Sequence, residues 1–307
     1  MKRVGRILFC LSASLLSLTC HAATVTNAAD NGPGTLRQAI ASAQSGDTID
    51  FSITGAIVLT NGELLITQRL TIQGPGASSL TVQRSTSAGT PDFRVFHLQS
   101  GIISISGLTV SNGQADLGGG IYNETTGNLQ DCVFRGNSST TSGGGVYNVS
   151  SLTLTNCTLT GNTVAGGPGA GYGGGIDNDG TVTALNCIVS SNSVTGAGQT
   201  NGLGGGIRNS GTLGITNSVV NGNVASDSGG GIFNEGTLAL NTSTVGSNLA
   251  NSGSGMGRGG GIANTFGTVT VDRSTISSNS VGVAGGNPGL GGGMANDTGS
   301  LVICNST

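Results

Sequence analysis

The chain has 307 residues, of which 58 are glycine, and it contains only three tyrosines, seven phenylalanines and no tryptophan. So few large side chains cannot fill the wide core of an ordinary globular domain of this length. Only 8% of the residues are charged, the mean hydropathy is +0.12 and the formal net charge is −3, which argues against both intrinsic disorder and a nucleic-acid partner.

Residues 1–22 have the three parts of a secretory signal peptide: a basic start, an apolar run and small residues before the cleavage point. The apolar run is too short to span a bilayer. We predict cleavage between Ala22 and Ala23. Lipidation at Cys20 is the alternative, but Leu18 does not fit the small-residue context of lipoprotein sites. Without the signal, the chain has eight arginines, no lysine and fourteen carboxylates, which gives a net charge of −6.

One helix is predicted ahead of the first strands. Residues 35–45 place their apolar side chains on one helical face, Thr35 and Gln38 form a capping box, and Gly46 is a suitable stop. A helix here would cover the open end of a stack of strands and prevent edge-to-edge pairing with another molecule.

The first strands are predicted at residues 47–51 and 53–59. Apolar alternation continues from residue 64 to residue 110, which is enough for roughly three less regular coils. We therefore assign residues 23–117 to an N-terminal cap and irregular first coils, ahead of a repeat region at 118–307.

The repeat region copies one short motif seven times. Three glycines, an aliphatic residue, one variable residue and an asparagine recur, and the triplets begin at Gly118, Gly143, Gly173, Gly204, Gly229, Gly259 and Gly291. A spacing of 25 to 32 residues is typical of a stacked array. Alternating stretches such as residues 152–159 follow the motif, and their period of two predicts strands.

A second asparagine closes each apolar run, 19 residues after the first glycine in the first five copies and 20 in the sixth. Glycine-rich links lead from it to the next triplet. Because such segments bury little apolar surface, we expect them to be loops on one edge of the stack. The chain stops at Thr307 inside the seventh unit, and we expect the sequence to be a fragment of a longer one.

A unit of about 25 residues with two or three short strands matches one coil of a parallel β-helix. Coils about 4.8 Å apart bring equivalent residues into columns. One predicted column is an apolar seam of Ile121, Val146, Ile176, Ile207, Ile232, Ile262 and Met294. A second holds small residues: Cys132, Cys157, Cys187, Ser218, Ser243, Ser274 and Ser306. The triplet asparagines form a third, in which each amide bonds its own turn and the next coil.

The cysteines of the small-residue column leave two alternatives. Cys132, Cys157 and Cys187 fall in neighbouring coils, close enough for a disulfide. Side-by-side positions in parallel strands seldom offer the required dihedral angle, so we favour stacked free thiols. Cys304 aligns with Thr155 and lies outside this column.

The two phased motifs resemble those of the polymorphic outer-membrane protein repeat family, a glycine pair plus aliphatic and a Phe-x-x-Asn. Residues 118–123 and 132–137 carry the resemblance, and Phe134 keeps the aromatic that later copies replace with aliphatic residues. Residues 35–51 and 70–76 are similar to the start of large secreted bacterial proteins with pectin-lyase-like passenger regions. The resemblance implies an all-β fold, a right-handed parallel β-helix (solenoid) with a short capping helix, exported and displayed at the cell surface. It implies no particular chemistry.

Pectin-lyase-like folds often cut acidic polysaccharides, so the charged residues were compared with that chemistry. Lyases need carboxylates for calcium and a basic residue, and hydrolases need facing carboxylates. The candidates are Asp177, Asp179 and Arg208, which fall in adjacent coils. The alternative is a solvated ion pair, with Asp179 in an outward column of acids. His97 is expected to be a partly buried structural residue.

Binding residues are expected among the outward aromatics. Tyr122, Tyr147 and Phe233 are candidates for stacking on sugar rings, or they are ordinary strand residues. No metal site and no cofactor are predicted.

The sequence thus favours a non-catalytic, secreted or outer-membrane-displayed, monomeric scaffold that binds glycan or protein as an adhesin does. The alternative is a polysaccharide lyase or hydrolase acting on acidic glycans.

Overall fold

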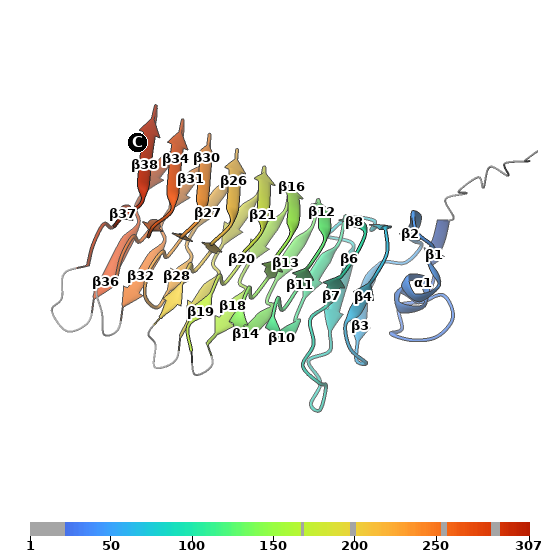
Figure 1. Ribbon diagram of the computed structural model, residues 1–307. Helices are drawn as coiled ribbons and strands as arrows, with labels where there is room; N and C mark the ends of the chain where they lie inside the picture. Colours follow the sequence, from blue (N-terminus) through green and yellow to red (C-terminus); the bar gives the residue numbers. More distant parts are fainter. Residues whose placement is uncertain (1–21, 167–168, 197–200, 253–256, 284–288) are drawn as a thin grey trace, which may run out of the picture.

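The structure, a computed structural model, describes residues 22–166, 169–196, 201–252, 257–283 and 289–307. The chain winds as a right-handed parallel β-helix, and its strands stack into long sheets that run the length of the molecule (Figure 1). Strand pairing is parallel throughout, as in β12 with β16. The predicted fold class is confirmed.

The sheets are named A to D. Sheet A contains β1 (Ala22–Val25), β2 (Asp47–Phe51), β5 (Leu70–Gln73), β8 (Ile102–Ser106), β12 (Thr126–Gln130), β16 (Ser151–Thr155), β21 (Thr181–Leu185), β26 (Thr212–Thr216), β30 (Thr237–Asn241), β34 (Thr268–Asp272) and β38 (Ser300–Cys304). Sheet B contains β3 (Gly55–Leu59), β6 (Leu80–Arg84), β9 (Thr109–Ser111), β13 (Val133–Arg135), β17 (Thr158–Thr160), β22 (Ile188–Ser190), β27 (Val219–Asn221), β31 (Thr244–Gly246) and β35 (Thr275–Ser277). Sheet C contains β4 (Leu64–Ile66), β7 (Phe96–Leu98), β11 (Ile121–Asn123), β15 (Val146–Asn148), β20 (Ile176–Asn178), β25 (Ile207–Asn209), β29 (Ile232–Asn234), β33 (Ile262–Asn264) and β37 (Met294–Asn296). Sheet D contains β10 (Gln114–Leu117), β14 (Ser138–Ser142), β18 (Thr163–Ala165), β19 (Gly171–Tyr172), β23 (Ser193–Thr195), β24 (Gly202–Leu203), β28 (Val224–Ala225), β32 (Leu249–Ser252) and β36 (Ser280–Val283).

The helix α1 (Leu36–Ser42) caps the first coil, as predicted. Leu36 and Ile40 belong to the main apolar core, and Arg37 ties the cap to the next coil by donating to the carbonyls of Gly62 and Glu63 at 2.7 and 2.8 Å. No helix in the described part of the chain is long and apolar enough to cross a bilayer.

The end of α1 differs from the prediction. The helix stops at Ser42 because Ala43 is already extended, at φ −64° and ψ 146°; Gly46 instead makes the turn into β2, at φ +100°. Only half of the capping box forms: the Gln38 N–H donates to the Thr35 hydroxyl, while the Thr35 N–H donates to Gly32.

The irregular first region contains fewer coils than predicted. Residues 64–111 build β4 to β6 and then β7 to β9, two coils where the sequence suggested about three. The missing coil is accounted for by an excursion over residues 85–95, which adds no strand. Sheets A, B and C continue from these coils into the repeat region without a break.

The predicted columns are confirmed by the strand register. Ile121 pairs with Val146 and Val146 with Ile176, and the small-residue column is buried from Cys132 to Ser274. Cys132, Cys157 and Cys187 are free thiols, as favoured, and Cys304 is exposed.

Two buried amide ladders connect the coils. In the triplet column, Asn148 donates to the Asn178 side-chain oxygen at 2.7 Å and to the Ser150 carbonyl at 3.0 Å, which confirms the predicted double role. In the closing column, the backbone N–H and the side-chain amide of Asn162 both donate to the Asn192 side-chain oxygen at 2.9 Å. The ladders satisfy buried backbone groups at the corners.

The glycine triplets are required by close stacking. Their first glycines have φ between 57° and 71°, a left-handed region that favours glycine. At the second glycine there is no room for a side chain, because a Cβ on Gly144 would collide with the carbonyl oxygens of Thr163 and Gly174.

The links are not simply loops, which corrects the prediction. Their first residues form sheet D, where Val164, Val194 and Ala225 make a second small apolar cluster. The signal was an apolar residue two positions after the closing asparagines from Asn162 to Asn279, which is enough for a short strand but not for a recognisable alternation.

Candidate functional site

Five of the six predicted site residues lie in one outward column of sheet C, and the sixth, Asp179, follows directly after β20. The register places Tyr122 beside Tyr147, then Asp177, Arg208 and Phe233 in successive coils. The column therefore brings together both the catalytic and the binding candidates.

Arg208 is the centre of a charged cluster. Its Nη1 donates to Asp177 at 3.3 Å and to Asp179 at 2.5 Å, and its Nε and Nη2 donate to Glu235 at 3.0 and 2.8 Å. The guanidinium also lies over the Tyr172 ring, 5.1 Å from its centre. The sequence predicted three members of this cluster and missed Glu235 and Tyr172.

The cluster is buried at Asp177 but open at Asp179 and Glu235, whose side chains are 36% and 37% exposed, so a solvated ion pair describes only its outer part. The side chains of Asp177 and Arg208 are only 1% and 17% exposed. Asp179 is more open, and it accepts hydrogen bonds from the Ser210 and Tyr147 hydroxyls at 2.5 and 2.8 Å.

Burial and charge set the protonation states. Burial raises the pKa of Asp177 to about 6, and the attraction of Arg208 only partly opposes it. Burial alone would lower the pKa of Arg208, but the charges of Asp177 and Glu235 outweigh it and the pKa is raised. Burial alone would raise the pKa of Asp179, but hydrogen bonds from Ser210 and Tyr147 outweigh it and hold that pKa below the usual value.

This arrangement does not suit the predicted chemistry. Arg208 stays protonated, so it cannot remove a proton from a substrate. Asp177 has little to offer an incoming sugar, because its side chain is only 1% exposed. Within the described residues there is also no group of three or more His, Cys, Asp or Glu side chains placed to hold a metal ion.

Two of the aromatic candidates, Tyr122 and Tyr147, have their rings in contact with each other. Tyr122 stacks on His97 with ring centres 5.0 Å apart and contacts Tyr147 at 5.2 Å. Phe233 is only 7% exposed, which corrects its assignment as an exposed aromatic. One-coil spacing thus places Tyr122 between two rings, so its faces are not open for stacking on a sugar ring.

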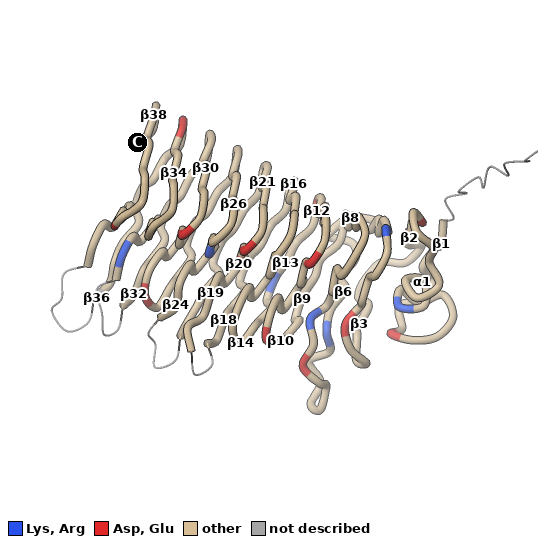
Figure 2. Tube along the Cα trace, viewed as in Figure 1, with Lys and Arg blue, Asp and Glu red and all other residues tan. Residues whose placement is uncertain are grey.

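The column begins with a second polar group that the sequence did not reveal. His97 is partly buried, as expected, but its Nδ1 lies 3.0 Å from Glu63 and its Nε2 lies 2.6 Å from Glu124. Arg94 pairs with Glu63 at 3.0 Å. Its guanidinium also lies over the Tyr122 ring, 5.0 Å from the ring centre. Both signs of charge thus alternate along one stretch of the stack (Figure 2).

Comparisons with protein-family models and with curated proteins gave no match. Among solved structures, the chain is similar to the pectate lyase Pel9A, with 14% identity and a TM-score of 0.53 over 94% of this chain and 79% of that one. It is also similar to the ORF18 protein of Geobacillus virus E2, with 13% identity and a TM-score of 0.50 over 93% of this chain and 61% of that one. At these identities the likeness establishes the parallel β-helix fold alone.

Proposed function

We propose that this chain is an exported β-helix scaffold that binds a glycan at the cell surface without cleaving it. The observation that carries the proposal is the pairing of Arg208 with three carboxylates. Its guanidinium is shared by Asp177, Asp179 and Glu235, so the one basic group of the cluster is engaged. Asp177 is buried, and the more exposed Asp179 and Glu235 are both held by Arg208.

Catalysis is the second candidate, and one observation favours it. A carboxyl with a pKa near 6, as at Asp177, lies in the range of a general acid at neutral pH. The name of the similar pectate lyase points the same way. Against both stand the burial of Asp177 and the saturation of Arg208, since a general acid must reach its substrate.

An activity assay separates the two candidates. The purified protein is incubated with pectate, alginate and neutral polysaccharides, and new chain ends are measured, while a glycan array reports binding. Binding without new chain ends supports the scaffold. New ends that vanish in Asp177→Asn, Asp179→Asn and Arg208→Gln together would establish the enzyme instead.

Export and display rest on the resemblance of the repeats to polymorphic outer-membrane proteins and on the signal-like start. Residues 1–21 of that start lie outside the described residues, and β1 begins at Ala22. The N-terminal sequence of the mature protein tests this part: Ala23 is expected first, and an intact Met1 in secreted material would contradict it.

A further inference from the structure

A hollow opens beside the start of the outward column, where the excursion over residues 85–95 meets sheet D. Its lining comes from the segments before β4 and β7 and from strands β10 and β14: Glu63, Asp92, Phe93, Arg94, Gln114, Ala115, Asp116 and Thr140. Its cavity volume is about 250 Å³, slightly below the range of about 300 to 1,000 Å³ that is usual for drug-sized ligands, so it suits one small unit.

The walls of the hollow are held in place before any ligand arrives. Arg84 donates to the carbonyls of Thr90 and Pro91 at 3.0 and 2.8 Å and to Asp92 at 2.9 Å, which fixes the excursion. The other oxygen of Asp92 accepts from the Gln114 side chain at 3.1 Å. Such preorganisation lowers the entropy lost on binding.

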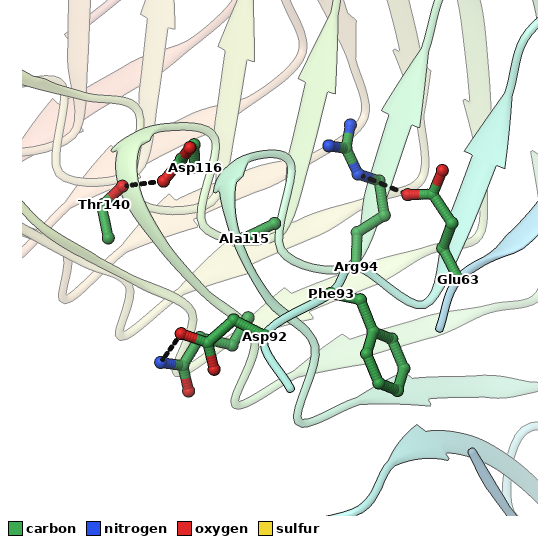
Figure 3. Close-up of a pocket in the computed structure, with 8 residues that line it drawn as sticks. Glu63, Asp92, Phe93, Arg94, Ala115, Asp116 and Thr140 are labelled. Atoms are coloured by element: carbon green, nitrogen blue, oxygen red, sulfur yellow. Dashed lines mark hydrogen bonds and ion pairs between the residues drawn. The ribbon is translucent and has the colours of Figure 1, made fainter. Parts of the chain in front are cut away.

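The polar groups face the space from different sides. In Figure 3, Asp116 and Thr140 lie on one side, the Arg94–Glu63 pair lies on another, and Asp92 lies below. One oxygen of Asp116 accepts from Thr140 at 2.8 Å, and the carboxylate has no cationic partner among the residues that the structure describes. Nη1 of Arg94 is buried and makes no hydrogen bond with the described residues.

This chemistry selects among ligand classes. Carboxylates are acceptors, while amide and guanidinium groups donate, so a ligand rich in hydroxyl groups can bond to all of them. Glu63 and Asp92 are already paired with arginines, which leaves the charge of Asp116 in excess. A uronate or another anion would be repelled by it. Phe93 is 7% exposed, so an apolar ligand finds little surface.

We propose that this hollow is the sugar subsite of the molecule and that it takes a neutral saccharide unit, in contrast to the acidic glycans that the fold first suggested. The proposal rests on the glycan-binding function proposed above and adds the place and the ligand class. Asp116 accepts hydrogen bonds from sugar hydroxyls, and Gln114 and Arg94 orient the ring.

The test is calorimetric titration of the purified protein with neutral hexasaccharides, such as cello- and mannohexaose, and with hexasaccharides of uronic acids. Asp116→Ala is expected to weaken binding of the neutral probe about tenfold or more, since tenfold is about 1.4 kcal/mol, the scale of one hydrogen bond to a charged group. Gln114→Ala removes a neutral contact and is expected to weaken binding about threefold or more. Asp272→Ala on sheet A is the matched control and is expected to change nothing. Equal melting temperatures exclude misfolding of the variants.

The outcomes separate the assignment of the hollow from the proposed glycan-binding function on which it rests. Unchanged binding in both hollow variants overturns the assignment of the hollow and leaves glycan binding standing. Preference for the uronate probe overturns the ligand class. Absence of binding to every glycan on the array overturns the proposed function together with its subsite.

Discussion

Replacing Asp177 with asparagine should stabilise the protein at neutral pH. Its pKa is about 6 in the folded chain against 3.8 for the unconstrained residue. The folded state therefore holds the proton more tightly, and stability falls as pH rises from below 3.8 through about 6. A shift of about two units corresponds to about 3 kcal/mol. Asparagine resembles the protonated acid, and Arg208 keeps Asp179 and Glu235 as partners.

The assay is urea unfolding of both proteins at about pH 3.5 and about pH 7.5, on either side of the titration. The variant is expected to match the parent at the lower pH and to exceed its free energy of unfolding by up to about 3 kcal/mol at the higher. Asp179→Asn is the control of opposite sign, because the pKa of Asp179 lies below its usual value and its charge stabilises the fold. If Asp177→Asn destabilises the protein only at the higher pH, the ion pair outweighs burial and the reasoning fails.

Three further predictions concern the stacking itself. Asn178→Ala removes amide bonds to Asn209 and Thr212 at 2.7 and 3.0 Å and should cost about 3 kcal/mol or more in urea unfolding, because buried partners lose their bonds. Gly144→Ala should lower the free energy of unfolding by about 3 kcal/mol, because the added Cβ collides with the backbone. The control Gly214→Ala, with no atom within 4 Å of its Cβ, should change the free energy of unfolding by at most about 0.5 kcal/mol. Equal effects of the two substitutions would contradict close stacking. In the native protein freed of its signal, the exposed Cys304 should react with a maleimide at once. Cys132, Cys157 and Cys187 should react only after unfolding, since each is only 1% exposed, and early labelling of all four would show that the column opens.

The sequence predicted the register well because the repeat is strict. Once Ile121 and Val146 are aligned, every position of the two coils is aligned, and the asparagine ladder follows from geometry. The same alignment of repeats is sufficient to pair Asp177 with Arg208, which the strand register confirms. What the repeats predicted was adjacency along the stack.

The burial of a side chain was harder to predict than its position, because burial depends on which other residues cover the column. Phe233 and Asp177 both occupy outward positions, yet they are 7% and 1% exposed. At Arg208 the covering group is Tyr172, from a link that the sequence marked as a loop. A link of small residues carries too weak an alternation to reveal that it forms a strand and covers its neighbour.

Where a β-helix can bind a ligand follows from the same stacking. Equivalent side chains in successive coils lie about 4.8 Å apart, so rings and charges in a strict column meet their own neighbours first, as His97 meets Tyr122. The polar and aromatic groups of a regular column are therefore already paired with one another, and only the edges of these side chains remain for a ligand. Free polar groups remain where the repeat is interrupted, as at residues 85–95. Across the hollow beside this excursion, Asp116 has no cationic partner within the described part of the chain. In this fold the repeated motif accounts for the architecture, and recognition of a sugar is expected at the departure from it.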